Sequence, residues 1–281
     1  MRVLVGIVAH NRADVLPAAI QSALRQSFAG TGVLVYDSGS TDATSALRGN
    51  YPHIGWKSSG QNIGCVRARN EMMAEAAVDL YCSLDDDAWF MRDDVLDIAV
   101  RLFEKNHRLG ALAFDILSPD RPDVVPLGGA VQAGLFIGCG HVLRLSAVRE
   151  AGYYVESPGF YGAEEKDLCV RLLDLGWEIA KVPGLHVWHE KTPVARDIPA
   201  QHRSGVCNDL TFALRRYPLP LVLWVLPGKV LSHLWFGLRH GLLRPCLRGM
   251  ALFIRHFTEV AVQRNPVSVA AIQEFAQRTK V

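Results

Sequence analysis

The sequence lacks the motifs of several common classes of nucleotide-binding enzyme. No G-x-G-x-x-G follows its first apolar segment, which argues against a dinucleotide cofactor. G-K-[ST] and G-x-S-x-G are also absent, so neither a P-loop nor a hydrolase nucleophile elbow is expected. The first half has no stripe of basic and aromatic residues, and we therefore expect no nucleic-acid partner.

Closely spaced cysteines are missing too. The six cysteines of this 281-residue chain are dispersed, with no C-x-x-C pair, which is typical of buried free thiols in a reducing compartment. The first apolar run, Val3–Val8, is too short for a signal peptide. We therefore expect a cytoplasmic protein.

Acidic residues are absent from one long segment. Between Leu210 and Thr258 there is no Asp or Glu but seven Lys or Arg, so the net charge of +2 leaves −5 for the rest of the chain. Apolar residues recur there at helical spacing, and no uninterrupted run approaches the ~20 residues that span a bilayer. From Ile198 onward, five prolines at 199, 218, 220, 227 and 245 predict short helical pieces. Three roles suit such helices: lying on the anionic inner face of a membrane, covering the catalytic domain, or forming a homodimer.

Short apolar segments alternate with helical patterns over the first 90 residues. Four strands are expected, at Val3–Val8, Val33–Tyr36, Trp56–Ser58 and Leu80–Leu84. Asp14 can cap the first helix, and a second helix is expected from about Cys65 to Ala77. This alternation predicts βαβ units and a mostly parallel sheet, in which ligands bind at the carboxyl ends of the strands.

The rest of the chain changes character near residue 200. A glycine-rich stretch over 128–140 precedes a helix at Lys166–Leu175 and a strand at Ile179–Val182, and from Ile198 the pattern is helical. We expect one domain over 1–200, with a first half over 1–90 and a second half over 91–200. The remaining 201–281 would form a helical C-terminal extension.

Three adjacent acidic residues follow the predicted strand at Leu80–Leu84. Asp85 and Asp87 can jointly hold a divalent cation, and oxygen ligands suit Mg²⁺ or Mn²⁺, which keep positions open for diphosphate oxygens. The simpler alternative is a helix N-cap or a solvated acidic turn. Three adjacent like charges repel one another without a counter-ion, which favours the metal site.

A second acidic pair, Glu164 and Glu165, opens a predicted helix. Carboxylates are stabilised at helix N-termini by the helix dipole, which is the structural explanation. The catalytic explanation is a general base that removes a proton from an acceptor hydroxyl, a role that contributes roughly 10²–10⁴ in rate.

Other polar residues lie near the predicted strand ends. His189 follows a strand and can bind metal or diphosphate, although a lone histidine is more often structural. Asp37 can accept the imide N–H of uracil or thymine, and Asp is also a common turn residue. Asn62, Gly64 and Arg67 lie at a probable helix start, where an arginine and free amides suit a base or phosphate.

Taken in order, these segments resemble the inverting GT-A glycosyltransferases of family 2, over roughly residues 3–215. Five motifs carry the resemblance. They are the opening Val8-Ala9-His10-Asn11-Arg12 with Ser22 and Gln26, the D-x-G-S-x-D-x-T signature at 37–44, the N-x-G-x-x-x-A-R-N pattern at 62–70, the L-D-x-D motif at 84–87, and Glu164-Glu165-Lys166-Asp167-Leu168 in place of E-D-x-D-L.

The resemblance implies a GT-A fold, with a mostly parallel sheet flanked by helices, and a nucleotide-diphosphate sugar such as a UDP- or dTDP-sugar as donor. It also implies that 1–200 is the catalytic domain, with a nucleotide-binding half over 1–90 and an acceptor half over 91–200. Ala9, His10, Asn11 and Arg12, together with Asp37, would frame the nucleobase. The nucleotide would also be contacted by Asn62, Gly64, Arg67, Asp85 and Asp86. Mn²⁺ or Mg²⁺ would be bound by Asp85, Asp87 and His189, and the base would be Glu165 or Glu164.

Two positions depart from the family pattern. Ala9 replaces the usual Thr, so a base contact there must come from the backbone, and Glu165 replaces the usual Asp. The acceptor, a small molecule or a lipid-linked glycan in glycan or natural-product biosynthesis, is left open. The alternatives are a sugar-1-phosphate nucleotidyltransferase, which would need a glycine-rich basic loop that Val8–Arg12 does not provide, and a non-catalytic nucleotide-sugar-binding protein.

Overall fold

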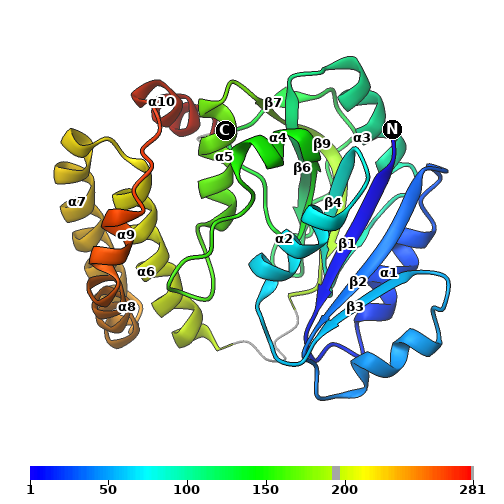
Figure 1. Cartoon of the computed structure of the whole chain (residues 1–281), viewed down its shortest axis with the longest axis horizontal. Helices are drawn as coiled ribbons and strands as arrows, with labels where there is room; N and C mark the ends of the chain where they lie inside the picture. Colours follow the sequence, from blue (N-terminus) through cyan, green and yellow to red (C-terminus); the bar gives the residue numbers. More distant parts are fainter. Residues whose placement is uncertain (192–196, 280–281) are drawn as a thin grey trace.

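The computed structural model describes residues 1–191 and 197–279 and shows a mixed β-sheet between helices, followed by a group of C-terminal helices (Figure 1). The strand order is β3-β2-β1-β4-β8-β6-β9-β5, and β7 pairs with β9. The N-terminal half contributes β1 (Val3–Ala9), β2 (Thr31–Ser38), β3 (Gly55–Ser59) and β4 (Leu80–Asp85). These four strands are parallel, as predicted.

The register of these strands brings three carboxyl ends together. Ala9 of β1 lies opposite Asp37 of β2, and Val8 lies opposite Asp85 of β4. The loops after β1, β2 and β4 therefore leave the sheet at one place, which is where a parallel sheet presents a ligand site.

The second half of the sheet reverses direction at one strand. β8 (Gly140–Arg144) is antiparallel to both β4 and β6 (Leu109–Leu117), so β6 and its parallel neighbour β9 (Glu178–His189) run in the direction of β1. The short strands β5 (Ala88–Phe90) and β7 (Val131–Gln132) pair antiparallel with β9. The sheet is therefore mostly, but not wholly, parallel.

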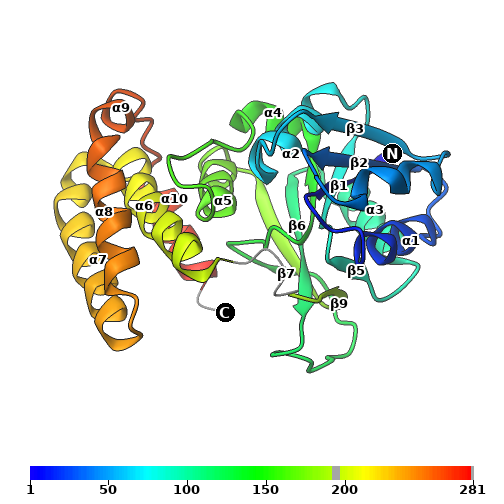
Figure 2. The same cartoon turned by 90° about the horizontal axis from the view of Figure 1, so that it is seen from below.

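Helices cover both faces of the sheet (Figure 2). On one face lie α1 (Leu16–Leu24) and α3 (Val95–Lys105), and on the other α2 (Cys65–Glu75), α4 (Leu145–Ala151) and α5 (Glu164–Asp174). Each face buries its own apolar cluster, because alternate residues of a strand point to opposite sides.

The predicted cap of the first helix is wrong. Asp14 does not cap α1, whose N-cap is Val15 without a side-chain hydrogen bond. Asp42 does cap the short 3-10 helix η1 (Ala43–Gly49), where its side chain accepts a hydrogen bond from the Thr44 N–H. The proline at position 17 pre-orders the first turn of α1 instead.

The C-terminal helices are longer than predicted. They are α6 (Ile198–Arg216), α7 (Leu219–Arg239), α8 (Leu243–Arg255), α9 (Phe257–Val262) and α10 (Val269–Arg278). The prolines do not divide the tail into short pieces. Those at 199, 220 and 245 fall in first turns, where the missing N–H has no helical partner in any case, and only Pro227 lies inside a helix.

Ion pairs and apolar contacts join the C-terminal helices to the sheet domain. Asp167 of α5 accepts hydrogen bonds from Arg171 Nε at 2.8 Å and from Arg216 Nε of α6 at 2.6 Å, and all three side chains are buried. The last helix, α10, returns to pack on α5, where Val267 and Ile272 contact the apolar cluster around α5. Helix α5 is therefore held from the sheet side and from the C-terminal side.

Candidate active site

The loop after β1 is fixed to the segment after β2 by side-chain hydrogen bonds. Asn11, with a φ of 54°, accepts a hydrogen bond from the Thr41 backbone N–H at 2.8 Å. The backbone N–H of Arg12 donates to Thr44 Oγ1 at 2.8 Å. These contacts hold His10 and Arg12 at the carboxyl end of the sheet.

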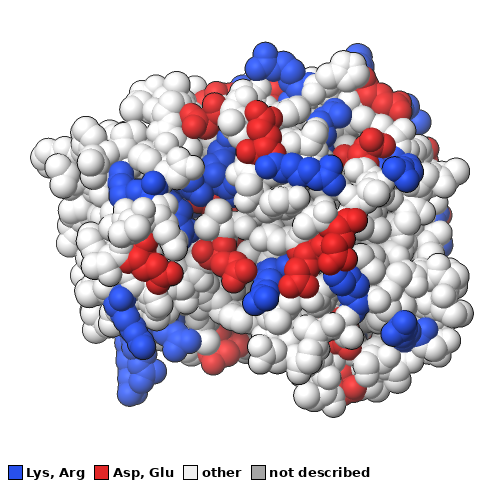
Figure 3. Space-filling model, viewed as in Figure 1, with Lys and Arg blue, Asp and Glu red and all other residues white. Residues whose placement is uncertain are grey.

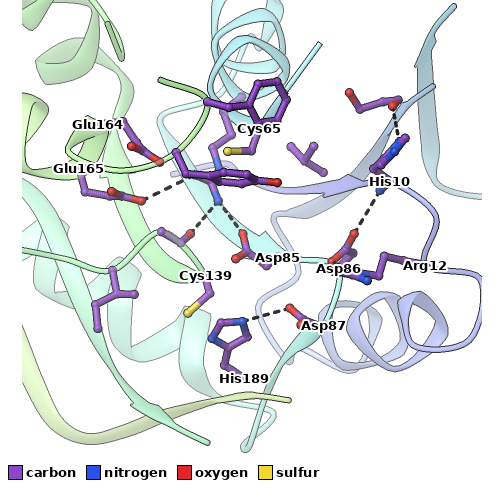
Figure 4. A pocket seen from close by; sticks show the side chains of 18 of the residues that line it. His10, Arg12, Cys65, Asp85, Asp86, Asp87, Cys139, Glu164, Glu165 and His189 are labelled. Carbon is purple, nitrogen blue, oxygen red and sulfur yellow. Dashed lines mark hydrogen bonds and ion pairs between the residues drawn. The ribbon is translucent and has the colours of Figure 1, made fainter. Parts of the chain in front are cut away.

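A cavity of about 370 Å³ lies at this end of the sheet (Figure 4). It collects residues from the loop after β1, the start of α2, the acidic turn after β4, the loop before β8, the start of α5 and the end of β9. Its lining residues are Val8, His10, Arg12, Ser38, Asn62, Gly64, Cys65, Arg69, Asp85, Asp86, Asp87, Ile137, Gly138, Cys139, Phe160, Tyr161, Glu164, Glu165, His189 and Gln201.

Two of the three adjacent aspartates are paired with arginines. Arg69, buried on α2, donates from Nη2 to Asp85 Oδ1 at 2.6 Å. Asp86 lies 3.3 Å from Arg12 Nε and accepts from the His10 backbone N–H at 3.2 Å. Burial raises the pKa of Asp86 to about 7, and the charges of Asp85 and its other neighbour add to the rise, while Arg12 opposes it. The cluster is therefore only partly neutralised by the protein.

The third aspartate meets His189 through strand pairing. Ala88 of β5 lies opposite His189 of β9, which sets the preceding residue, Asp87, beside the imidazole. Asp87 Oδ1 lies 3.2 Å from His189 Nε2, and the carboxylate is almost fully buried. Residues 102 positions apart in the sequence thus face the same cavity (Figure 4).

The potential ligand atoms around His189 fit one metal ion. Single ligand atoms of Asp85, Cys139 and His189 all lie within 4.8 Å of one another, which is compatible with metal–ligand bonds of ~2.0–2.3 Å to one centre. Asp87 contacts the same imidazole. Carboxylates and an imidazole suit Mn²⁺, whereas a thiol is a soft ligand, and burial raises the pKa of Cys139 and disfavours its thiolate.

A tight loop sets the direction of α5. Gly162 and Ala163 both have positive φ, 94° and 75°, immediately before the helix. Asn208 of α6 secures this loop, because its side chain accepts from the Gly159 N–H at 2.7 Å and donates to the Tyr161 carbonyl at 2.9 Å. The loop geometry places the first turn of α5 at the cavity.

Glu165 occupies the inner position of the acidic pair. Its carboxylate lies 4.0 Å from Arg69 Nη1 and against Gly138, where an added Cβ would collide with Glu165 Oε1. Burial and the neighbouring charge of Glu164 raise the pKa of Glu165 to about 8, while Arg69 lowers it. A carboxylate with a raised pKa in a cavity is the usual environment of a general base.

A second cavity of about 410 Å³ adjoins the first at Glu165. It is bounded by the loop before β8 and by α5 and α6, and it shares Ile137, Gly138 and Glu165 with the first cavity. On its far side lie Lys166 and Asp209. Glu165 therefore faces two compartments, one acidic and one bounded by the C-terminal helices.

The model of glycosyl transferase family 2 matches residues 4–117. The N-terminal part of the chain is therefore similar to the glycosyltransferases of family 2. The match spans β1 to β6, including the acidic turn after β4, and ends before α5. No curated protein sequence matches the chain.

Solved glycosyltransferase structures share the fold of the whole chain. S. aureus TarS in complex with UDP-GlcNAc aligns at a TM-score of 0.65 and 17% identity, over 92% of this chain and 80% of TarS. The mannosyltransferase PcManGT from Pyrobaculum calidifontis, in complex with GDP-Man and Mn²⁺, aligns at 0.60 and 14% identity, over 98% and 79%. GalNAc-T7 with UDP, GalNAc and Mn²⁺ aligns at 0.65 and 13% identity, over 78% and 48%. The chain therefore has the GT-A fold.

Most residues selected from the sequence line the first cavity. The structure places ten of them around it: His10, Arg12, Asn62, Gly64, Asp85, Asp86, Asp87, Glu164, Glu165 and His189. Their roles stay predictions, but they meet in one space of the described chain although they come from five segments.

Four selected residues do not line the cavity. Ala9 is fully buried within the sheet, and Asn11 joins the two loops. Asp37 is buried and accepts a hydrogen bond from the Ser40 N–H at 3.0 Å, so its contact with a base stays a prediction. Arg67 requires a correction, because it lies outside the cavity with an exposed side chain that pairs with Glu71.

Arg69, and not Arg67, is the arginine of α2 that lines the cavity. Two residues along a helix rotate the side chain by ~200°, so Arg69 points into the cavity when Arg67 points away. Four further lining residues were not selected: Cys139, Phe160, Tyr161 and Gln201. The A-R-N part of the motif at 68–70 was a usable signal for Arg69; a lone cysteine and two aromatic residues in a loop carried none.

Proposed function

We propose that this chain is a glycosyltransferase that transfers a sugar from a nucleotide-diphosphate donor, a UDP- or dTDP-sugar, to an acceptor hydroxyl with inversion at C1. The observation that supports it most strongly is the position of Glu165, which lies between an acidic cavity and a second cavity. A donor in the first cavity and an acceptor in the second would meet at this carboxylate. The nucleotide-sugar complexes of TarS and PcManGT support a donor of this class.

The proposed reaction needs one proton transfer and one displacement. Glu165 takes the proton from the acceptor hydroxyl, and the oxygen attacks C1 of the sugar from the face opposite the diphosphate. The bond from C1 to the diphosphate oxygen breaks, the nucleoside diphosphate leaves, and the anomeric configuration inverts. Arg69 holds Asp85 and limits the rise in the pKa of Glu165, so it links the donor side of the site to the base.

We propose that Asp85, Asp87 and His189 hold a divalent cation, Mn²⁺ or Mg²⁺. When bound, such an ion neutralises the charge of the leaving diphosphate. The imidazole favours Mn²⁺ over Mg²⁺, since Mg²⁺ binds almost exclusively through oxygen. His10, Arg12, Asn62 and the other residues around the entrance would contact the nucleotide.

The acceptor side is formed by residues outside the family 2 match. The second cavity is lined by the segment 135–138, by α5 and by α6. We propose that this cavity receives the acceptor, a small molecule or a lipid-linked glycan. The segment after His189 is also expected to contribute to acceptor choice, and its residues 192–196 lie outside the described residues. All six cysteines are free, and we propose a cytoplasmic location for the reaction.

Calorimetric titration with nucleoside diphosphates tests the donor site. We expect UDP or dTDP to bind at least ~10-fold more tightly with Mn²⁺ present than with a chelator, because the acidic turn repels a diphosphate unless a cation intervenes. GDP and ADP serve as base controls. Binding that ignores the cation would contradict the proposed metal site, and preferred binding of GDP would replace the proposed bases.

A further inference from the structure

The outer face of α7 is apolar along the length of the helix. Trp224, Leu231, Trp235 and Leu238 recur at spacings of three, four and seven residues, which places them on one side. Their exposed fractions are 82%, 67%, 67% and 63%. A 21-residue helix is ~30 Å long, so the face is far longer than a chance cluster of exposed residues. The surface over α7, at the left of Figure 3, carries almost no charge.

The opposite side of α7 is fixed to the protein. Lys229 and His233 of α7 both bind Asp209 of α6, at 2.8 Å and 3.0 Å. Burial raises the pKa of Asp209, but the hydrogen bond from His233 and the nearby ammonium groups hold it well below its usual range. Gly237 of α7 allows close packing of α8, since an added Cβ would lie 3.1 Å from the Leu243 backbone. The exposed face therefore points outward in a defined direction.

This attachment distinguishes a surface helix from a spanning one. α7 is long and apolar enough to cross a membrane by composition alone, and only 11% of its apolar window is buried. Spanning would pull Lys229 and His233 off Asp209 and would leave charged groups in hydrocarbon. Lying flat on a bilayer keeps these contacts and still covers the apolar face.

Basic residues of α8 continue the same surface. Arg244, Arg248 and Arg255 are exposed and lie on one side of α8, next to the exposed Leu247 and Ile254. Figures 1 and 3 place basic side chains over the end of the molecule where α7 and α8 lie side by side. An apolar stripe with two tryptophans, bordered by arginines, matches the layers of an anionic bilayer: hydrocarbon, interface and charged headgroups.

The charge pattern argues against a second copy of the chain as the occupant. No Asp or Glu occurs between 210 and 258, so a symmetric dimer through this face would set arginine beside arginine without a counter-charge. Asp209, the nearest acid in the sequence, is already bound by Lys166, Lys229 and His233.

We propose that the α7–α8 face, defined by Trp224, Leu231, Trp235, Leu238, Arg244 and Arg248, binds the surface of an anionic lipid membrane. Asp209 lines the second cavity and also binds Lys229 of α7. This one residue therefore connects the helix of the proposed membrane surface with the proposed acceptor side. This inference goes beyond the transfer reaction and does not depend on it.

Flotation of the full chain with lipid vesicles tests the proposal. The wild type is expected to float with vesicles of phosphatidylcholine containing about one third phosphatidylglycerol, and to remain at the bottom with phosphatidylcholine alone. Trp224→Ser with Trp235→Ser, and separately Arg244→Gln with Arg248→Gln, should each lower the bound fraction at least ~10-fold, since interfacial binding depends on buried apolar area and on charge. Arg48→Glu, an exposed residue of η1, is the matched control and should float like the wild type.

Three results would overturn the proposal. The first is equal flotation of the wild type and both double variants, and the second is equal flotation with neutral and anionic vesicles. The third is a wild-type protein that does not float and elutes as a dimer, where the tryptophan variant elutes as a monomer. Bound protein that resists carbonate extraction would overturn the surface mode in favour of a spanning α7. Circular dichroism of the variants checks that they are folded, and release of nucleoside diphosphate checks that they remain active. A variant that passes both checks but does not float has lost membrane binding alone.

Discussion

Replacing Glu165 by glutamine is expected to reduce turnover at least ~100-fold while nucleotide binding stays within a few-fold of wild type. Glutamine keeps the size of the side chain and its contacts with Gly138 but cannot accept the acceptor proton. Turnover is measured as nucleoside diphosphate released from a donor with acceptor present, and binding by calorimetry. Near-normal turnover would remove Glu165 from the mechanism.

Glu164→Gln is the matched control for this substitution. Glu164 lines the same cavity, and its charge raises the pKa of Glu165. The base acts when ionised, so wild-type kcat/KM should rise with pH through an apparent pKa near 8 and level off above it. Removing the charge of Glu164 lowers the pKa of Glu165 and moves this limb to lower pH. If Glu164→Gln lost ~100-fold in turnover while Glu165→Gln kept normal turnover, Glu164 would be the base instead of Glu165.

Replacing Asp87 by asparagine is expected to cost ~100–1000-fold in turnover and to weaken activation by Mn²⁺. Asparagine retains the shape and the contact with His189 but removes the negative charge that offsets the cation. Titration of activity against Mn²⁺ concentration measures the effect. Unchanged Mn²⁺ activation would exclude Asp87 from the metal site.

Cys139→Ser separates the two possible ligand sets. A hydroxyl occupies the space of the thiol, so a site built from carboxylates and imidazole should keep its Mn²⁺ activation in this variant. A loss comparable to that of Asp87→Asn would show that Cys139 is a ligand and that the site binds a softer metal than proposed.

The N-terminal half of the fold was predictable because its signals are local. Each strand is a short apolar run, and parallel strands must place their carboxyl ends together, so the polar residues after β1, β2 and β4 were expected to meet. The antiparallel insertion of β8 was not predictable in this way, because pairing between distant strands leaves no local pattern.

Side-chain direction limited the prediction of the site. Arg67 and Arg69 lie on the same helix, and only the packing of α2 against the sheet decides which one enters the cavity. A buried arginine also contradicts the usual preference of charged residues for solvent, and its contacts with Asp85, Glu165 and the Gly138 carbonyl explain it. The loop before β8 places Cys139 beside Asp85 and His189, and the course of this loop depends on tertiary contacts.

In the C-terminal helices, the positions of the prolines determine where helices begin, and their number does not determine how many helices form. Five prolines predicted a broken tail, yet three of them fall in first turns, where they initiate helices. The sequence showed the apolar recurrence, but the length of α7 and the exposure of its apolar face were established only by the structure.

The most direct test of the central claim is donor turnover by the wild-type chain. Nucleotide sugars with different bases are incubated with Mn²⁺, and the nucleotide product is identified by chromatography. Sugar transfer predicts release of a nucleoside diphosphate from at least one UDP- or dTDP-sugar, abolished in Glu165→Gln. Pyrophosphate formed from a nucleoside triphosphate and a sugar 1-phosphate would indicate nucleotidyl transfer instead, and tight donor binding without any product would indicate a non-catalytic binding protein.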